Sequence, residues 1–130
     1  MHPEEEMETL LRGVCPQSGH WPYTKSADLY IGFRPGGEEL TFSSSRVTGT
    51  LVIYDIVICA RRGRLMEMET LRYGLYDALH RAGWQLTDKP GPESYNRATD
   101  LFMWPVSAKK RYAIGPGGLP ESPERRDSHA

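Results

Sequence analysis

The hydrophobic pattern of the chain is clearest in two segments, one typical of a strand and one typical of a helix. Residues 46–60 are rich in β-branched side chains, and from Leu51 onward both alternating faces of the segment are apolar. We therefore expect a long strand covered on both faces, either by other elements of its own domain or by a neighbouring subunit. In residues 64–82, apolar side chains recur every three or four positions up to Gly83, which predicts an amphipathic helix. Gly74 costs this helix up to about 1 kcal/mol relative to Ala, and we interpret it as a mark of close packing.

Shorter segments complete the pattern. Residues 3–13 begin with Pro and three Glu and carry an apolar stripe, so we expect a short helix that docks on the rest of the domain. Residues 28–33 predict a short strand, ended by the turn signal Arg-Pro-Gly-Gly at 34–37. A strand is expected at 84–87, and a last one at 100–114. A proline interrupts this last strand and implies a sheet edge or a bulge, because proline cannot donate a ladder hydrogen bond.

The order of these elements predicts the fold class. Helices and strands are mixed on one chain of 130 residues, and only one connection is long enough for a crossover, which favours an α+β fold. We expect a mostly antiparallel sheet of about four strands packed against one long helix, plus the short N-terminal helix. Residues 1–114 are expected to form a single domain. Residues 115–130 hold almost no apolar side chains, so we expect a flexible C-terminal tail.

Charge narrows the range of partners. With 16 basic and 17 acidic residues the net charge is −1, which argues against a generally basic nucleic-acid binder and leaves only local patches. No apolar run is long enough for a membrane span, and the acidic N-terminus is unlike a signal peptide. Two basic clusters form candidate subunit or partner interfaces: Arg61, Arg62 and Arg64, and Lys109, Lys110 and Arg111.

These basic clusters have two interpretations. They would contact phosphates or an acidic protein surface, or they are the polar ends of strands that protect a sheet edge from aggregation. The N-terminal helix carries four acids against one Arg. Basic and acidic regions on one small chain suit head-to-tail contact between identical subunits.

Catalytic chemistry has little support in the sequence. The chain lacks a phosphate-binding loop, a pair of His residues at metal-ligand spacing and a nucleophile elbow, so we expect no enzyme activity, no cofactor and no metal. Cys15 and Cys59 lack a Cys-x-x-Cys spacing. They are expected to be two reduced thiols, with Cys59 in the core, although their spacing also allows a single bridge.

One segment carries a family resemblance. LVIYDIVICARRGRLMEMETLRYGLYDALHRAGWQL resembles the tail-terminator and tail-completion (neck) proteins of long-tailed bacteriophages, in which a strand leads directly into a helix of LxxLxxxLxxAL type. The order of elements from residue 3 to 114 is similar to that family as well. The resemblance implies a structural virion protein, assembled in the host cytoplasm, with no catalytic residues. It also implies a ring, typically a hexamer, that caps the tail tube protein and joins it to the head–tail connector protein.

On this resemblance, the strand 46–60, the loop 34–45 and the basic clusters are interface elements. The clusters would meet acidic partners or face the lumen through which DNA passes. Two alternatives stay open. A head–tail connector or stopper protein of the phage neck would share the size and the ring habit. A small cytoplasmic adaptor would instead bind a peptide along an open sheet edge and stay monomeric.

Overall fold

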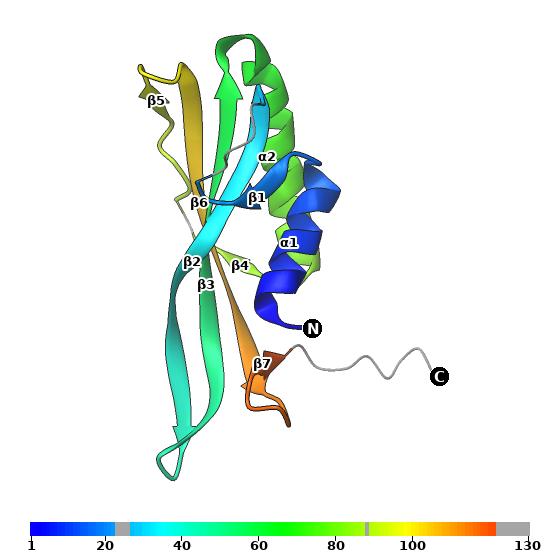
Figure 1. The fold of residues 1–130 in the computed structure, drawn as a ribbon, viewed down its shortest axis with the longest axis vertical. Helices are drawn as coiled ribbons and strands as arrows, with labels where there is room; N and C mark the ends of the chain where they lie inside the picture. Colours follow the sequence, from blue (N-terminus) through cyan, green and yellow to red (C-terminus); the bar gives the residue numbers. More distant parts are fainter. Residues whose placement is uncertain (23–26, 88, 122–130) are drawn as a thin grey trace, which may run out of the picture.

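Two helices cover one face of a long, curled β-sheet in the computed structural model of the chain (Figure 1). The structure describes residues 1–22, 27–87 and 89–121. The first half of the chain forms α1 (Pro3–Val14), β1 (Ser18–His20), β2 (Leu29–Ser43) and β3 (Arg46–Arg61). A 3-10 turn η1 (Arg62–Arg64) leads into α2 (Leu65–Arg81). The remaining elements are β4 (Gln85–Leu86), β5 (Ser94–Asn96), β6 (Leu101–Ile114) and β7 (Pro120–Glu121).

The sheet is larger than expected. Its strands follow the order β1-β2-β3-β6-β4, and β5 and β7 also pair with β6. The α+β class and the packing against the helix at 64–82 are confirmed. The expectation of about four strands is wrong, because the described sheet has seven. The sheet is mostly antiparallel but mixed, since β1 runs parallel to β2 while the other described pairings are antiparallel. The short strands come from polar or Pro- and Gly-containing segments without hydrophobic alternation, and backbone hydrogen bonds to the long strands hold them in place.

The turn predicted at 34–37 is a β-bulge inside a strand. The register between β2 and β3 shifts between Pro35 and Gly37, and Gly37 adopts a φ of 112°. Such a bulge bends a strand without ending it. The hairpin turn lies further on, at Ser44 and Ser45, whose φ angles of 49° and 65° match the positive values that tight hairpin turns require.

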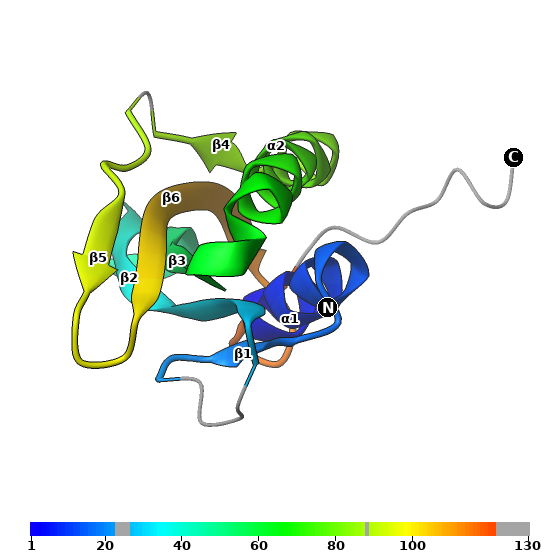
Figure 2. The same ribbon diagram turned by 90° about the horizontal axis from the view of Figure 1, so that it is seen from above.

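The main core lies between the sheet and the two helices. Both helices pack on the same face of the sheet, and Figure 2 shows them side by side. An aromatic row starts at the exposed His20 of β1 and continues through the buried Phe33, Tyr54, Trp84 and Tyr112. Successive ring centroids in this row are 4.6, 5.9, 5.9 and 6.0 Å apart. Because these rings come from five separate segments, the row links β1, β2, β3 and β6 to the end of the connection that follows α2.

The opposite face of the sheet is covered only at one end. There a smaller cluster buries Tyr30, Cys59 and Leu101, with Trp21 and Met103 packed against it. Further along β3, the side chains of residues 51–57 on this face stay partly exposed. The expected cover on both faces of the strand is therefore incomplete within the described part of the chain.

Two further predictions concern the proline in the last long strand and the C-terminal segment. Pro105 lies within β6, and its carbonyl accepts a hydrogen bond from the Gly91 N–H. The strands β4 and β5 pair with β6 on either side of Pro105. In the segment expected to be a flexible tail, Pro120–Glu121 form β7 against β6, and residues 122–130 lie outside the described residues. No helix in the described ranges has the length and apolar character to cross a membrane.

Candidate functional site

The first basic cluster lies where β3 ends and η1 begins, and its arginines already have partners within the chain. Arg61 pairs with Asp28, Nε to Oδ1 3.1 Å, and donates to the Thr99 carbonyl at 2.7 Å. Arg64 forms a two-pronged pair with Glu67 at 2.5 and 2.6 Å. Arg62 differs from both, because its guanidinium stacks over the rings of Tyr95 and Phe102. The Cζ atom lies 5.8 and 5.4 Å from the two ring centroids.

The second basic cluster is divided between the two faces of the sheet. Successive side chains of a strand point to opposite faces, so Lys110 faces the helices while Lys109 and Arg111 face the other way. Lys110 pairs with Glu6 of α1 and donates to the Ala82 carbonyl, at the end of α2, at 2.8 Å. It therefore connects both helices to the sheet.

The two clusters do not form one patch. Arg61 pairs with Leu101 in the ladder and Leu51 pairs with Arg111, so the clusters are separated by about 33 Å along the strands. The acids of α1 are also largely used within the chain: Glu4 pairs with His20, Glu6 with Lys110, and Glu8 with Arg12. Simple charge attraction between a basic and an acidic face is thus weaker than the sequence indicates.

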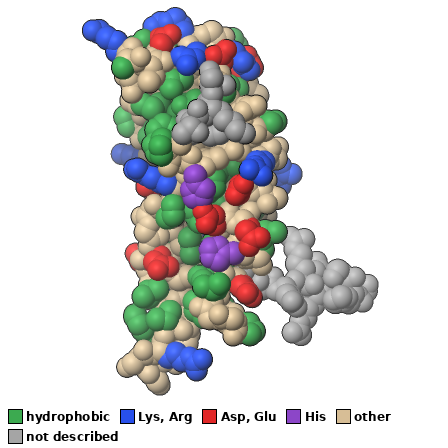
Figure 3. Space-filling view, viewed as in Figure 1, with side chains coloured by type: hydrophobic (Ala, Val, Ile, Leu, Met, Phe, Trp, Pro, Cys, Tyr) green, Lys and Arg blue, Asp and Glu red, His purple; other side chains and the backbone are tan. Residues whose placement is uncertain are grey.

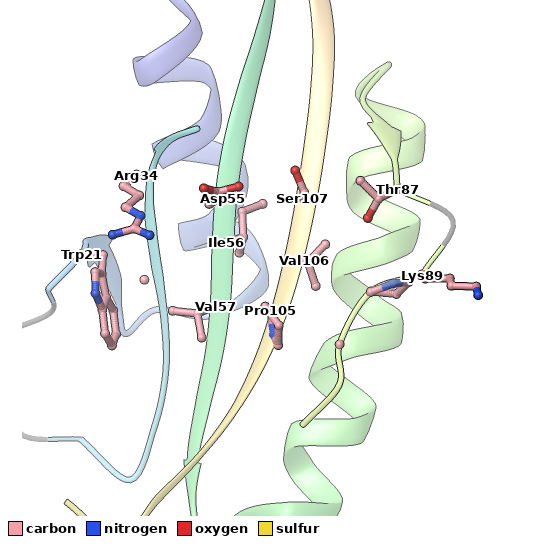
Figure 4. A pocket seen from close by; sticks show the side chains of 13 residues that line it. Trp21, Arg34, Asp55, Ile56, Val57, Thr87, Lys89, Pro105, Val106 and Ser107 are labelled. Atoms are coloured by element: carbon pink, nitrogen blue, oxygen red, sulfur yellow. The ribbon is translucent and has the colours of Figure 1, made fainter. Parts of the chain in front are cut away.

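A shallow pocket of about 400 Å³ lies on the sheet face opposite the helices. Figure 4 shows Trp21 and Arg34 on one side, Thr87 and Lys89 on the other, and Asp55 and Ser107 between them. Two glycines shape it. A Cβ at Gly32 would lie 2.6 Å from the Trp21 ring, and one at Gly36 would lie 2.9 Å from the Asp55 carboxylate.

The described lining of this pocket offers charged and hydroxyl groups to a ligand. Among the described residues, its lining contains the Ser107 and Thr87 hydroxyls but neither His nor Cys, so these residues supply no imidazole to activate either hydroxyl. Among the described residues, no group of three or more His, Cys, Asp or Glu side chains is placed to hold a metal ion.

Both thiols are free and buried. Burial raises the pKa of the Cys59 thiol to about 11, against a smaller lowering by its hydrogen bond with Tyr30. Burial also raises the pKa of Cys15, and a backbone hydrogen bond with Gln17 lowers it less. Because the thiolate is the nucleophile, neither residue is activated for covalent chemistry.

We expect both thiols to be silent towards a thiol-specific reagent such as Ellman's reagent in the folded protein at pH 8, and to react fully in denaturant. The neutral Cys59 thiol contributes stability that is complete below its ordinary pKa of 9.0 and is lost as the pH rises to about 11. The measurement is the thiol titre with and without urea, together with urea unfolding between pH 7 and 11. A fast-reacting thiol in the folded chain would contradict this assignment.

The distal half of the β2–β3 hairpin is the least covered part of the described chain. It extends past both helices at the end of the sheet away from η1 (Figure 1), and hydrophobic side chains are visible there in Figure 3. The side chains of Phe42 and Leu40 are 60% and 46% exposed. They stand two residues apart in one strand and so project from the same face of it. Beyond Ile31–Phe33, which pair with β1, the outer edge of β2 has no described strand neighbour.

No protein-family model matches the chain, and no curated protein sequence matches it significantly.

Leu40 and Phe42 are not among the side chains that the sequence predicts as an interface, which all belong to the two basic clusters. The loop 34–45, which contains both residues, was expected to be an interface element. The alternation of Leu40, Thr41 and Phe42 is a strand signal, but the Pro-Gly-Gly before it suggested a turn. Gly74 was expected to mark close packing. Within the subunit that interpretation is wrong, because a Cβ at Gly74 would have no neighbouring heavy atom within 4 Å, helix backbone aside.

Proposed function

We propose that this protein is a structural subunit of a bacteriophage tail, a tail-terminator or tail-completion protein that assembles into a ring. The ring, a hexamer by the resemblance of residues 3–114 to that family, would cap the tail tube protein and join it to the head–tail connector protein. The protein would act in the virion, after assembly in the host cytoplasm, and would have no enzymatic activity.

The exposed hairpin carries this proposal. Three strands of 15, 16 and 14 residues extend further than two helices can cover, so the β2–β3 hairpin ends in large apolar side chains exposed to water. Exposed apolar patches of this kind mark protein–protein contacts. The half-exposed sheet face, with Leu51 and Ile53 next to Lys109 and Arg111, has the mixed character of a surface that meets a partner or a lumen.

In this proposal only some of the six basic side chains predicted as interfaces would contact a partner. Lys110 acts inside the subunit, while Arg61 and Arg64 are held in ion pairs. Arg62 stacks on Tyr95 and Phe102, and Arg111 donates to the Thr41 hydroxyl. Neither they nor Lys109 have a described ion pair, so these three would meet an acidic partner or the DNA that passes through the ring.

Native mass spectrometry across a concentration series tests the proposal. We expect one closed oligomer, the hexamer, in equilibrium with monomer, because ring closure favours a single size over a ladder of sizes. Negative-stain electron microscopy of the same sample should then show rings. A chain that stays monomeric at every concentration would contradict the ring.

The open edge of β2 favours one alternative, an adaptor that binds a peptide. Residues 34–43 of β2 present backbone groups that an added strand could pair with. An adaptor of this kind would be a monomer whose β2 amides become protected from hydrogen exchange when an extended peptide is added. The oligomeric state therefore separates the two functions.

A further inference from the structure

A groove of about 750 Å³ lies between α1 and α2, and Leu29 of β2 is also part of its lining. Its walls include Leu10 and Val14 from α1, and Met66, Leu71 and Ala78 from α2. The side chain of Met66 is 85% exposed at its rim. The polar side chains of its lining are those of Thr9, Glu67, Thr70 and Arg81. The groove is thus a largely apolar hollow that the described part of the chain does not fill.

Two glycines keep this groove open, and the chain's own packing needs neither of them. Gly74 stands in the middle of α2 and Gly13 in the last turn of α1, and a Cβ at either position would meet no heavy atom within 4 Å apart from the helix's own backbone. Glycine inside a helix costs about 1 kcal/mol relative to Ala. The two glycines destabilise their helices without improving any packing inside the subunit. The open space beside them therefore suggests a contact with another molecule.

The end of the hairpin has the shape and chemistry to fill this space in another copy. Leu40 and Phe42 are a convex apolar pair on a narrow hairpin, whereas the groove is concave and apolar. The charges are complementary as well. Arg46 beside the hairpin turn has no described ion-pair partner, nor does Glu5, which lies one helical turn before the groove residue Thr9. The chain's own residues 122–130, SPERRDSHA, contain no large apolar side chain to compete for the groove.

We propose that Phe42 and Leu40 of one subunit insert between α1 and α2 of the next subunit, with Gly74 and Gly13 providing the room. The contact joins two different surfaces of the same chain, so it is head-to-tail, and repetition of such a contact closes a ring when the rotation allows. This inference rests on the proposed self-assembly and identifies the interface that makes it.

Photo-crosslinking tests the contact directly. Phe42 is replaced by p-benzoylphenylalanine in the full chain, and ¹⁵N-labelled and unlabelled chains are mixed so that crosslinks between copies are recognised by mass. We expect mixed-isotope crosslinks from position 42 to peptides within residues 9–14 or 66–81. Gly74→Arg, which fills the groove, should reduce them about tenfold or more.

Two matched controls accompany this experiment. Tyr73 is also 60% exposed but lies outside the groove lining, so the same photoreactive group there should give no crosslink to the hairpin. Gly63→Arg adds the same side chain at a position with equally open space outside the groove, and should leave the crosslinks unchanged. Circular dichroism shows whether each variant is folded.

The outcomes separate this interface from the ring itself. Crosslinks from position 42 to other regions, or none, overturn the interface, even if native mass spectrometry still shows a ring. Crosslinks in the groove from a chain that forms only dimers or open chains support the interface and contradict the ring. Crosslinks that persist undiminished in Gly74→Arg also overturn the proposal.

Discussion

Lys110→Met should lower the free energy of unfolding by about 3 kcal/mol, because the substitution leaves the Glu6 carboxylate without its cation in a poorly hydrated place. The Lys110 and Glu6 side chains are only 18% and 16% exposed. Lys110 also satisfies the Ala82 carbonyl at the end of α2, while Tyr112 donates to the second oxygen of Glu6 at 2.9 Å. Urea unfolding followed by circular dichroism at fixed protein concentration measures the effect.

The neighbouring lysine provides the control. Lys109→Met removes the same charge one residue away, on the opposite face of the sheet, where Lys109 has no described ion pair. We expect its free energy of unfolding to stay within about 0.5 kcal/mol of the wild type. Similar losses in the two variants would show that net charge, rather than the contact with Glu6, determines the stability.

Phe33→Ala should be more damaging still, with a loss of about 4 kcal/mol. Phe33 is 1% exposed, and its ring lies between His20 on β1 and Tyr54 on β3. Removing the ring breaks the aromatic row near its beginning and leaves a cavity below α1. The measurement is again urea unfolding, with the near-ultraviolet circular dichroism of the remaining aromatic residues as a second signal.

A conservative variant separates loss of volume from loss of the ring. Phe33→Leu keeps most of the buried apolar volume and should cost about 1.5 kcal/mol or less. If Phe33→Ala and Phe33→Leu were equally destabilised, the aromatic contacts rather than the filled volume would dominate. A Phe33→Ala protein as stable as the wild type would contradict the position of this residue in the core.

The sequence predicts the long elements of the fold well because their patterns are long. The helix at 64–82 and the strand at 46–60 each carry many matching positions, and they appear as α2 and β3. The continuation of β2 through Pro35 and Gly37 could not be read locally. Pairing with the strongly β-forming β3 overrides their turn preference and converts it into a bulge. The strands β5 and β7 are short and largely polar, so only their hydrogen bonds to β6 define them.

The candidate site shows the limit of local patterns more sharply. Lys109, Lys110 and Arg111 look like one basic cluster, but strand alternation places Lys110 among the helices. Its partner Glu6 is 104 residues away in the sequence, so the buried pair cannot be inferred from spacing. Phe42 looks like part of a polar loop in the sequence. Phe42 is exposed because the three long strands extend beyond both helices, so that nothing described covers the end of the hairpin (Figure 1). The sequence pattern around Phe42 does not show this.

An electron cryo-microscopy map of the assembled protein tests the central claim most directly. We predict a closed ring in which the β2–β3 hairpin of each subunit reaches its neighbour, with Phe42 between α1 and α2 beside Gly74. A ring whose hairpins end in solvent, or whose groove between the helices is empty, would contradict the account of how the subunits join. A particle without rotational symmetry would contradict the ring itself.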